Sequence, residues 1–139
     1  MDATLPRILE MHIPAEMRYI SLVRRGVRSL AESMGFPRED VADVEVAVSE
    51  AVANSVEHGS IPDAGAAVVV KCRICEDCLV VEIEDQSPAQ CLPSYSHPCD
   101  TITERGRGVM MMHALMDECE GTRTDHGIKV RMSKVRGRG

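Results

Sequence analysis

Two apolar, strand-like segments separated by only two residues constrain the fold of this chain more than any other feature. They span residues 66–75 and 78–85, and Glu76 and Asp77 join them. A two-residue loop fixes the register of an antiparallel hairpin. In that register one face carries only apolar side chains, counting cysteine as apolar, so we expect that face to be buried. The predicted cross-strand pairs are Cys75 with Cys78, Ile74 with Leu79, Cys72 with Val81, Lys71 with Glu82 and Val70 with Ile83.

The same alternation places Asp85 on the apolar face, at the end of the second segment. A carboxylate at the end of a core face needs a polar partner. Two interpretations stay open. Either the strand simply ends there, or the carboxylate faces a pocket.

The rest of the chain predicts three helices and further strands around this hairpin. Helices are not interleaved one for one with strands, which favours an α+β, two-layer α/β sandwich. Its helices would pack on one face of a mixed, mostly antiparallel sheet, in a single domain over residues 1–139. The predicted elements are a strand at Arg7–Pro14, helices at 15–34 and 37–59, a loop at 86–104, a glycine turn and helix at 106–118 with Val109, Met112 and Met116 buried, and a hairpin over 119–134.

Composition disfavours several classes of protein. The 139 residues carry a formal net charge of −6, and 2% of them are aromatic. These values disfavour general DNA binding and a stacking platform for single strands. No apolar run reaches the ~18 residues of a membrane span, and the N-terminus lacks a secretory pattern. We expect a cytoplasmic protein with no direct contact to nucleic acid or membrane. Its basic tail at about 135–139 is interpreted as a solvated end, with contact to an acidic partner as the alternative.

Three of the six cysteines form a C-x-x-C-x-x-C pattern at Cys72, Cys75 and Cys78. Similar spacings occur in iron–sulfur and zinc sites. The odd separation of Cys72 and Cys75 places them on opposite faces of one strand. We therefore interpret these residues as buried or incidental thiols. A metal or redox sensor remains the alternative.

A polar stripe on the second predicted helix is a candidate site. Glu50 and Asn54 are one turn apart and share a face. An asparagine beside a glutamate could ligate Mg²⁺ next to a base. The competing interpretation is an ordinary solvated face. Gly106 and Gly108, at the start of the next helix, could let the backbone approach a phosphate.

Together these segments resemble the anti-sigma-factor serine/threonine kinases of bacteria, within the GHKL superfamily of histidine kinase-like ATPases. The stretch VAVSEAVANSVEHG is similar to the family's N-box, and VEIEDQSPA lies where the family has its first glycine box. ERGRGVMMMHALMDE is similar to the second glycine box, and GIKVRMSK resembles the closing strand. The resemblance runs from about Arg7 to Lys134 and implies a Bergerat-type ATP-binding fold.

The resemblance implies roles by position. Glu50 would be the general base that deprotonates a substrate hydroxyl. Asn54 would hold Mg²⁺ between the phosphates, and Asp85 would accept a hydrogen bond from the adenine amino group. Arg105 is a catalytic candidate for contact with the γ-phosphate. The other residues implied to bind the nucleotide are Ser87, Gly106, Arg107, Gly108 and Ile128, and the loop at about 86–104 would be the ATP lid.

Two positions depart from the family's pattern at the adenine end. Ser87 stands where the family has glycine, and Ile128 stands where it has threonine. Serine tolerates a positive φ poorly, and isoleucine has no hydroxyl. We therefore expect ATP or ADP binding that is weakened rather than abolished.

The resemblance implies an ATP–Mg²⁺-dependent anti-sigma serine/threonine kinase. Its partners would be a sigma factor, which it sequesters, and a STAS-type antagonist, which it phosphorylates. They would dock near the first predicted helix, and a homodimer is a further expectation. The alternative is a weak or inactive partner-binding module on the same fold. The basic residues of that helix are Arg18, Arg24, Arg25 and Arg28.

Overall fold

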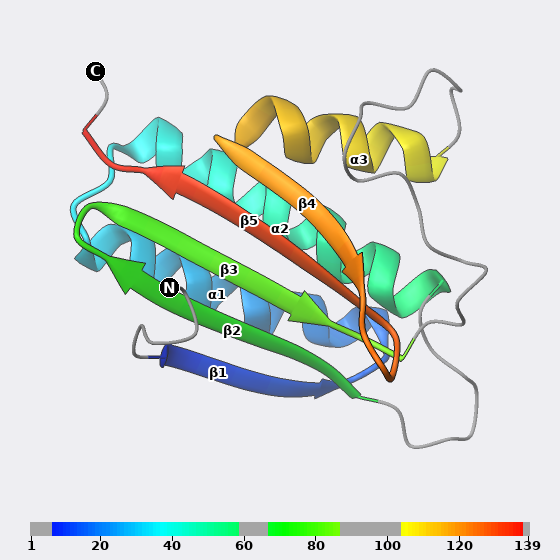
Figure 1. The fold of residues 1–139 in the computed structure, drawn as a ribbon. Coiled ribbons are helices and arrows are strands. Elements are labelled where there is room, and N and C mark those ends of the chain that lie inside the picture. Colours follow the sequence, from blue (N-terminus) through cyan, green and yellow to red (C-terminus); the bar gives the residue numbers. More distant parts are fainter. Residues whose placement is uncertain (1–6, 59–66, 87–103, 138–139) are drawn as a thin grey trace.

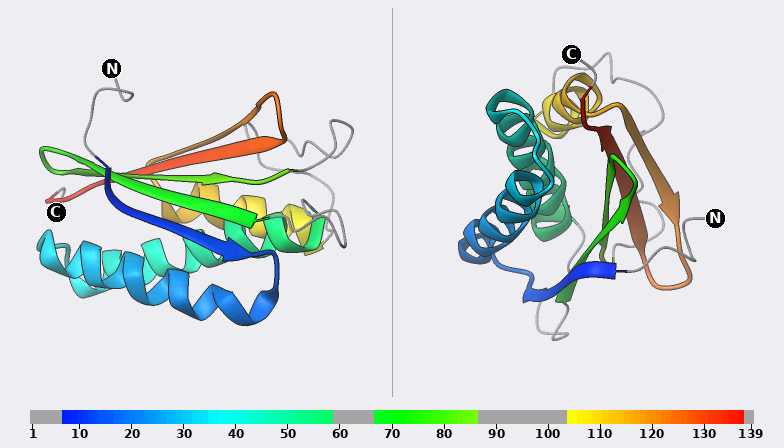
Figure 2. Two further views of the ribbon diagram at one scale, coloured as in Figure 1. Left: turned by 90° about the horizontal axis from the view of Figure 1, so that it is seen from below. Right: turned by 90° about the vertical axis from the view of Figure 1, so that its left-hand side faces the viewer.

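The computed structural model describes residues 7–58, 67–86 and 104–137, which form a two-layer α+β sandwich (Figure 1). Five strands form one sheet in the order β1-β2-β3-β5-β4. Three α-helices lie on one face of this sheet, and no described helix covers the other face (Figure 2). The elements are β1 (Arg7–Pro14), the 3-10 helix η2 (Met17–Tyr19), α1 (Ile20–Ser33), α2 (Arg38–His58), β2 (Ala67–Cys75), β3 (Cys78–Glu84), α3 (Glu104–Leu115), β4 (Glu118–Arg123) and β5 (Ile128–Val135).

The predicted fold class is confirmed, with differences in detail. The prediction included a mixed sheet, whereas every pair of neighbouring strands in the described residues is antiparallel. The first α-helix also begins later than predicted. Residues 14–19 form tight turns instead of α-helix. The N–H of Glu16 donates to Pro14 O at 2.7 Å, so it is already hydrogen-bonded outside the helix. Helix α1 then ends before Gly35, whose φ of +83° is typical of a helix C-terminus.

The central hairpin has the predicted register at all five pairs. Its apolar face packs against the helices, and Val70, Leu79 and Ile83 are fully buried there. On the other face Lys71 does oppose Glu82, but the closest ion pairs run diagonally because long basic side chains reach beyond their direct neighbour. They join Arg73 Nε to Glu82 at 3.1 Å, Lys129 Nζ to Glu82 at 3.6 Å and Lys71 Nζ to Glu84 at 3.5 Å.

Helix α2 lies at the centre of the helical layer. It packs against α1 on one side and α3 on the other, and also contacts β2 and β3. The three side chains that the sequence predicted to be buried are buried: Val109 and Met112 lie in α3, and Met116 follows directly after the helix ends at Leu115. The fully buried residues of α2 are all valine or alanine, so the neighbouring elements can approach closely: Val44, Ala47, Val48, Ala51 and Val52.

Arg136 ties the tip of the central hairpin to the connection between α1 and α2. Its backbone N–H donates to Asp77 O at 2.6 Å, and its Nη1 donates to Met34 O. Arg136 therefore links the hairpin tip to the end of α1. In Figure 1 the tip lies at the end of the sheet next to this connection.

The hairpin turn contains a backbone strain that can be tested. Glu76 has a φ of 54° and is the one non-glycine residue in the described ranges with positive φ. Glu76→Gly should raise the free energy of unfolding by about 1 kcal/mol, because glycine has no Cβ to clash in this conformation. Asp77→Gly is the matched control. It should lower the free energy of unfolding by up to about 1 kcal/mol, since it adds only unfolded-state entropy. Urea unfolding measures both, and a change of the same sign in the two variants would contradict the strain.

Candidate functional site

The second half of α2 meets the first turns of α3, and this contact brings two predicted segments together. A Cβ at position 108 would lie 2.9 Å from Glu50 Oε2 and 3.6 Å from Asn54 Nδ2. Glycine at this position therefore lets the α3 backbone lie directly over both side chains. The structure thus joins Glu50, Asn54 and Gly108 in one small volume.

The interpretation of the α2 stripe as a solvated face is wrong for Asn54. Its side chain is only 6% exposed, and Glu50 is half-buried, whereas Glu57 further along the helix is exposed. Asn54 Nδ2 has no hydrogen-bond partner among the described residues. A buried amide without a partner costs about 1–3 kcal/mol. The arrangement therefore fits a polar ligand that would satisfy this group.

Asp85 lies where β3 ends, against the start of β5. Its N–H donates to Ile128 O at 3.0 Å, and its Oδ1 accepts from Ile128 N at 3.4 Å. Of the two open interpretations, the strand does end here, and the carboxylate has a specific backbone contact. The Ile128 side chain belongs to the buried core, so only its backbone reaches Asp85.

Gly127 is what permits this close approach. A Cβ at position 127 would lie 1.9 Å from Asp85 O and 2.6 Å from the Cα of Gln86. Thr124, which the sequence analysis missed, holds the turn that presents this glycine. Its Oγ1 accepts from Gly127 N at 2.9 Å and from His126 N at 3.2 Å. The signal was the threonine three residues before a glycine in a predicted turn.

The predicted glycine turn before the third helix is wrong in one respect. Helix α3 begins at Glu104, so Gly106 and Gly108 lie within its first turns rather than ahead of it. The reason is tertiary, because the packing of α3 on α2 continues to Gly108 and requires a residue without a side chain there. Arg105 and Arg107 belong to the same turns. Ser87 and most of the predicted lid lie outside the described residues.

The candidate residues gather at one end of the molecule. The C-terminal ends of α2 and β3 and the N-terminal end of α3 point to the same side (Figures 1 and 2). A hollow of about 390 Å³ opens beside Asp85, on the side of the sheet away from the helices. It is lined by Ala67, Val69, Glu84, Asp85, Gln86, Thr124, Asp125 and His126.

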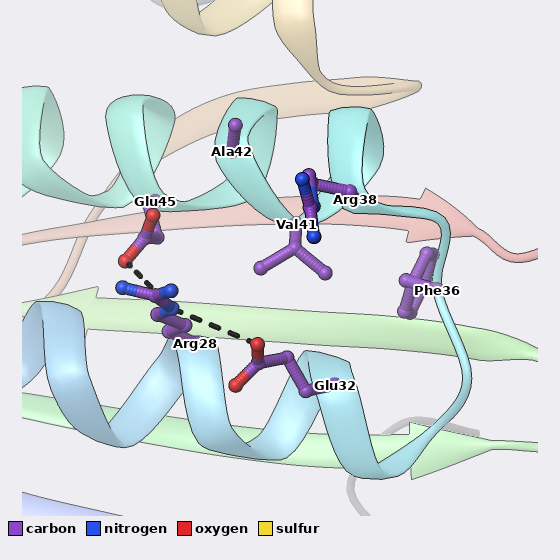
Figure 3. Close-up of a pocket in the computed structure, with 7 residues that line it drawn as sticks. All are labelled: Arg28, Glu32, Phe36, Arg38, Val41, Ala42 and Glu45. Carbon is purple, nitrogen blue, oxygen red and sulfur yellow. Dashed lines mark ion pairs between the residues drawn. The ribbon is translucent and has the colours of Figure 1, made fainter.

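A second hollow, of about 550 Å³, lies between α1 and the start of α2 (Figure 3). Arg28 crosses it and pairs with Glu32 at 3.7 Å and with Glu45 at 3.9 Å. Phe36 and Val41 provide its apolar lining. On the same basic helix Arg24 and Arg25 are exposed. This groove is lined by both helices and is separate from the Asn54 region.

The cysteine pattern does not form a metal centre in the part of the chain that the structure describes. Cys72 faces the core, and burial raises the pKa of its thiol to about 12. Cys75 and Cys78 lie at the hairpin tip instead. Within residues 7–58, 67–86 and 104–137, no three histidine, cysteine or acidic side chains are grouped to hold a metal ion.

Comparisons with known proteins point to one family. A model of the histidine kinase-like ATPase domain matches residues 13–134. The serine-protein kinase RsbW of Bacillus velezensis is 36% identical over 135 residues, which cover 91% of this chain and 84% of the relative. RsbW of Bacillus subtilis is 32% identical with the same coverage. None of the described helices is long and apolar enough to cross a membrane.

Solved structures share the fold. The RsbU and RsbW domains of a Mycobacterium tuberculosis protein match 94% of this chain with a TM-score of 0.70 and 22% identity. This chain spans 33% of that structure. The histidine kinase domain of a blue-light-activated kinase from Erythrobacter litoralis matches 95% of this chain and 64% of that one, with a TM-score of 0.57 and 18% identity. At these sequence identities the similarity shows a shared fold.

The contact at Gly127 gives a direct test of how the Asp85 end is built. Gly127→Ala should lower the free energy of unfolding by about 1–3 kcal/mol, because the new methyl group forces the backbones of β3 and β5 apart. Gly26→Ala adds the same methyl group inside α1, where its nearest atoms are the flexible ends of Met11 and Leu9 at 3.1 and 3.3 Å. That control should change stability by less than about 1 kcal/mol. Equal destabilisation of both variants in urea unfolding would contradict the close approach.

Proposed function

The chain belongs to the histidine kinase-like ATPase family and, through its serine-protein kinase relatives, is a protein serine kinase; on this premise we propose that it is an anti-sigma kinase. It would bind ATP with Mg²⁺, phosphorylate a serine or threonine of a STAS-type antagonist protein, and sequester a sigma factor. Since sigma factors act with RNA polymerase, we propose that it works in the cytoplasm.

One observation carries this proposal: Gly108 lies against Glu50 and the unpartnered amide of Asn54. An oxygen-binding cation such as Mg²⁺ uses few protein ligands and takes the rest from phosphates and water. The Asn54 Oδ1 would be such a ligand, and its Nδ2 could donate to a phosphate oxygen. The glycines of α3 would leave room for the phosphates beside the helix backbone.

The proposed chemistry needs positioning and charge neutralisation more than covalent catalysis. Mg²⁺, when bound, would neutralise phosphate charge. Glu50 would accept the proton of the substrate hydroxyl as that oxygen bonds to the γ-phosphorus of ATP and ADP leaves. Its half-buried position in α2 would hold the carboxylate beside the phosphates. Arg105 and Arg107, in the first turns of α3, are proposed to contact the phosphates.

Asp85, where β3 ends, is proposed to accept a hydrogen bond from the adenine amino group. The contacts to Gly127 and Ile128 hold its backbone in place. Ile128 stands where the family has threonine, so the hydroxyl that would contact the adenine base is missing. Ser87 stands where the family has a glycine at the adenine end. These departures favour weaker base binding, so a partner-binding module with little kinase activity is the second candidate. The residues at about 86–104 are proposed as the lid.

Partner docking is proposed at the basic helix α1 and the groove of Figure 3. Arg24 and Arg25 are exposed and could meet acidic segments of a sigma factor or antagonist. A homodimer is compatible with this assignment.

The nucleotide site is tested by Asn54→Ala. We expect the affinity for Mg²⁺–ADP to fall at least about 10- to 100-fold, because a charged ligand loses a buried polar contact. Ser55→Ala is the matched control, since Ser55 is the next residue of α2, is equally buried and also has an unpartnered side-chain oxygen. The affinity of Ser55→Ala for Mg²⁺–ADP should stay unchanged. Calorimetric titration measures both, and normal Mg²⁺-dependent binding by Asn54→Ala would refute the assigned site.

The catalytic role is tested by Glu50→Gln, which keeps the size of the side chain. Phosphorylation of a STAS-type antagonist should slow by about 10²–10⁴-fold, the usual contribution of a general base, while nucleotide affinity changes little. Glu39→Gln, an exposed position in the first turn of the same helix, should retain full activity. Nucleotide binding without any transfer by the unmodified chain would instead favour the partner-binding module.

A further inference from the structure

The tip of the central hairpin carries two cysteines that the proposed kinase site does not use. Cys75 and Cys78 are direct partners in the β2–β3 register and flank the turn at Glu76 and Asp77. Both are free thiols. Solvent reaches the pair because Cys75 is exposed and Cys78 is only half-buried.

The backbone geometry suits a bond between these two sulfurs. Residues directly opposite in an antiparallel pair have Cα atoms about 4.5–5.5 Å apart. A disulfide spans Cα separations of about 4.4–6.8 Å. The Cβ atoms of directly opposed residues also leave the sheet on the same face. The register therefore brings the two cysteines within the Cα range that a disulfide can span.

Two other cysteines are poor candidates for the same chemistry. Cys72 is fully buried on the core face, and burial raises the pKa of its thiol to about 12. Burial similarly raises the pKa of Cys119 to about 11. The thiolate is the reactive form, so neither should react. Burial also raises the pKa of the half-buried Cys78, so the exposed Cys75 is the thiol expected to react first, with Cys78 directly opposite it.

We propose that Cys75 and Cys78 form a reversible disulfide, a thiol–disulfide exchange site at the hairpin tip. The Cys75 thiolate attacks one sulfur of a small-molecule disulfide such as oxidised glutathione, and one glutathione thiolate leaves. The Cys78 thiolate then attacks Cys75 Sγ and displaces the second. The protein loses two electrons and two protons, and the small disulfide is reduced to two thiols.

The position of the pair separates it from the nucleotide end. The tip lies at the opposite end of the sheet from the end of β3 where Asp85 stands (Figure 1). Asp77, between the cysteines, accepts from Arg136 N, and Arg136 also reaches Met34 between α1 and α2. The disulfide would therefore form next to the helix connection that leads into the groove of Figure 3.

The test equilibrates the full chain in glutathione buffers of increasing oxidation, quenches with acid and alkylates the remaining thiols. Intact mass should show a species with four alkylated cysteines instead of six. Cleavage after Glu76 cuts the chain between the two cysteines. The two fragments should stay joined in the oxidised species and separate after reduction.

Single variants assign the two steps. Cys78→Ser should trap glutathione on Cys75 as a mixed disulfide that lasts at least about tenfold longer than in the unmodified chain, because the effective concentration of the second thiol is lost. Cys119→Ala, at a buried cysteine outside the pair, should oxidise like the unmodified chain. Two outcomes would overturn the proposal: a bond from Cys75 or Cys78 to Cys91 or Cys99, or alkylation of both tip cysteines in buffers that oxidise a reference C-x-x-C peptide.

Discussion

The burial of α2 on three sides is the constraint on which the rest of the structure depends. The helix packs against α1, α3 and the sheet, and valine and alanine fill these contacts. Glu50 and Asn54 lie on the side of α2 that meets α3, and the glycine of α3 at position 108 accommodates them. The fold and the candidate site follow from the same packing.

That arrangement lowers stability in identifiable places. Asn54 and Ser55 each have a buried polar atom without a partner among the described residues, at about 1–3 kcal/mol each. Gly106 and Gly108 also place two residues of low helix propensity in the first turns of α3. Local rules are broken together mainly at functional sites. A bound polar ligand would satisfy the buried amide of Asn54.

The two ends of the sheet have different characters. At one end Gly127 brings β5 against Asp85, next to the polar residues of α2. At the other end Arg136 joins the hairpin tip to the helix connection beside two accessible cysteines. The antiparallel strands of the sheet run between these two ends and separate them.

The sequence alone determined the central hairpin and the limits of most elements. A two-residue loop and a period-two pattern leave one register that gathers the alternating apolar side chains on one face, because a shift by one residue would invert both faces. The motifs also selected Glu50, Asn54 and Gly108, which the structure brings together. Only the tertiary structure decided that Asn54 is buried, that Gly108 lies within a helix and that Thr124 supports Gly127. Each depends on contacts between segments distant in the chain, such as residues 54 and 108, and local periodicity carries no information about which element covers a helix face.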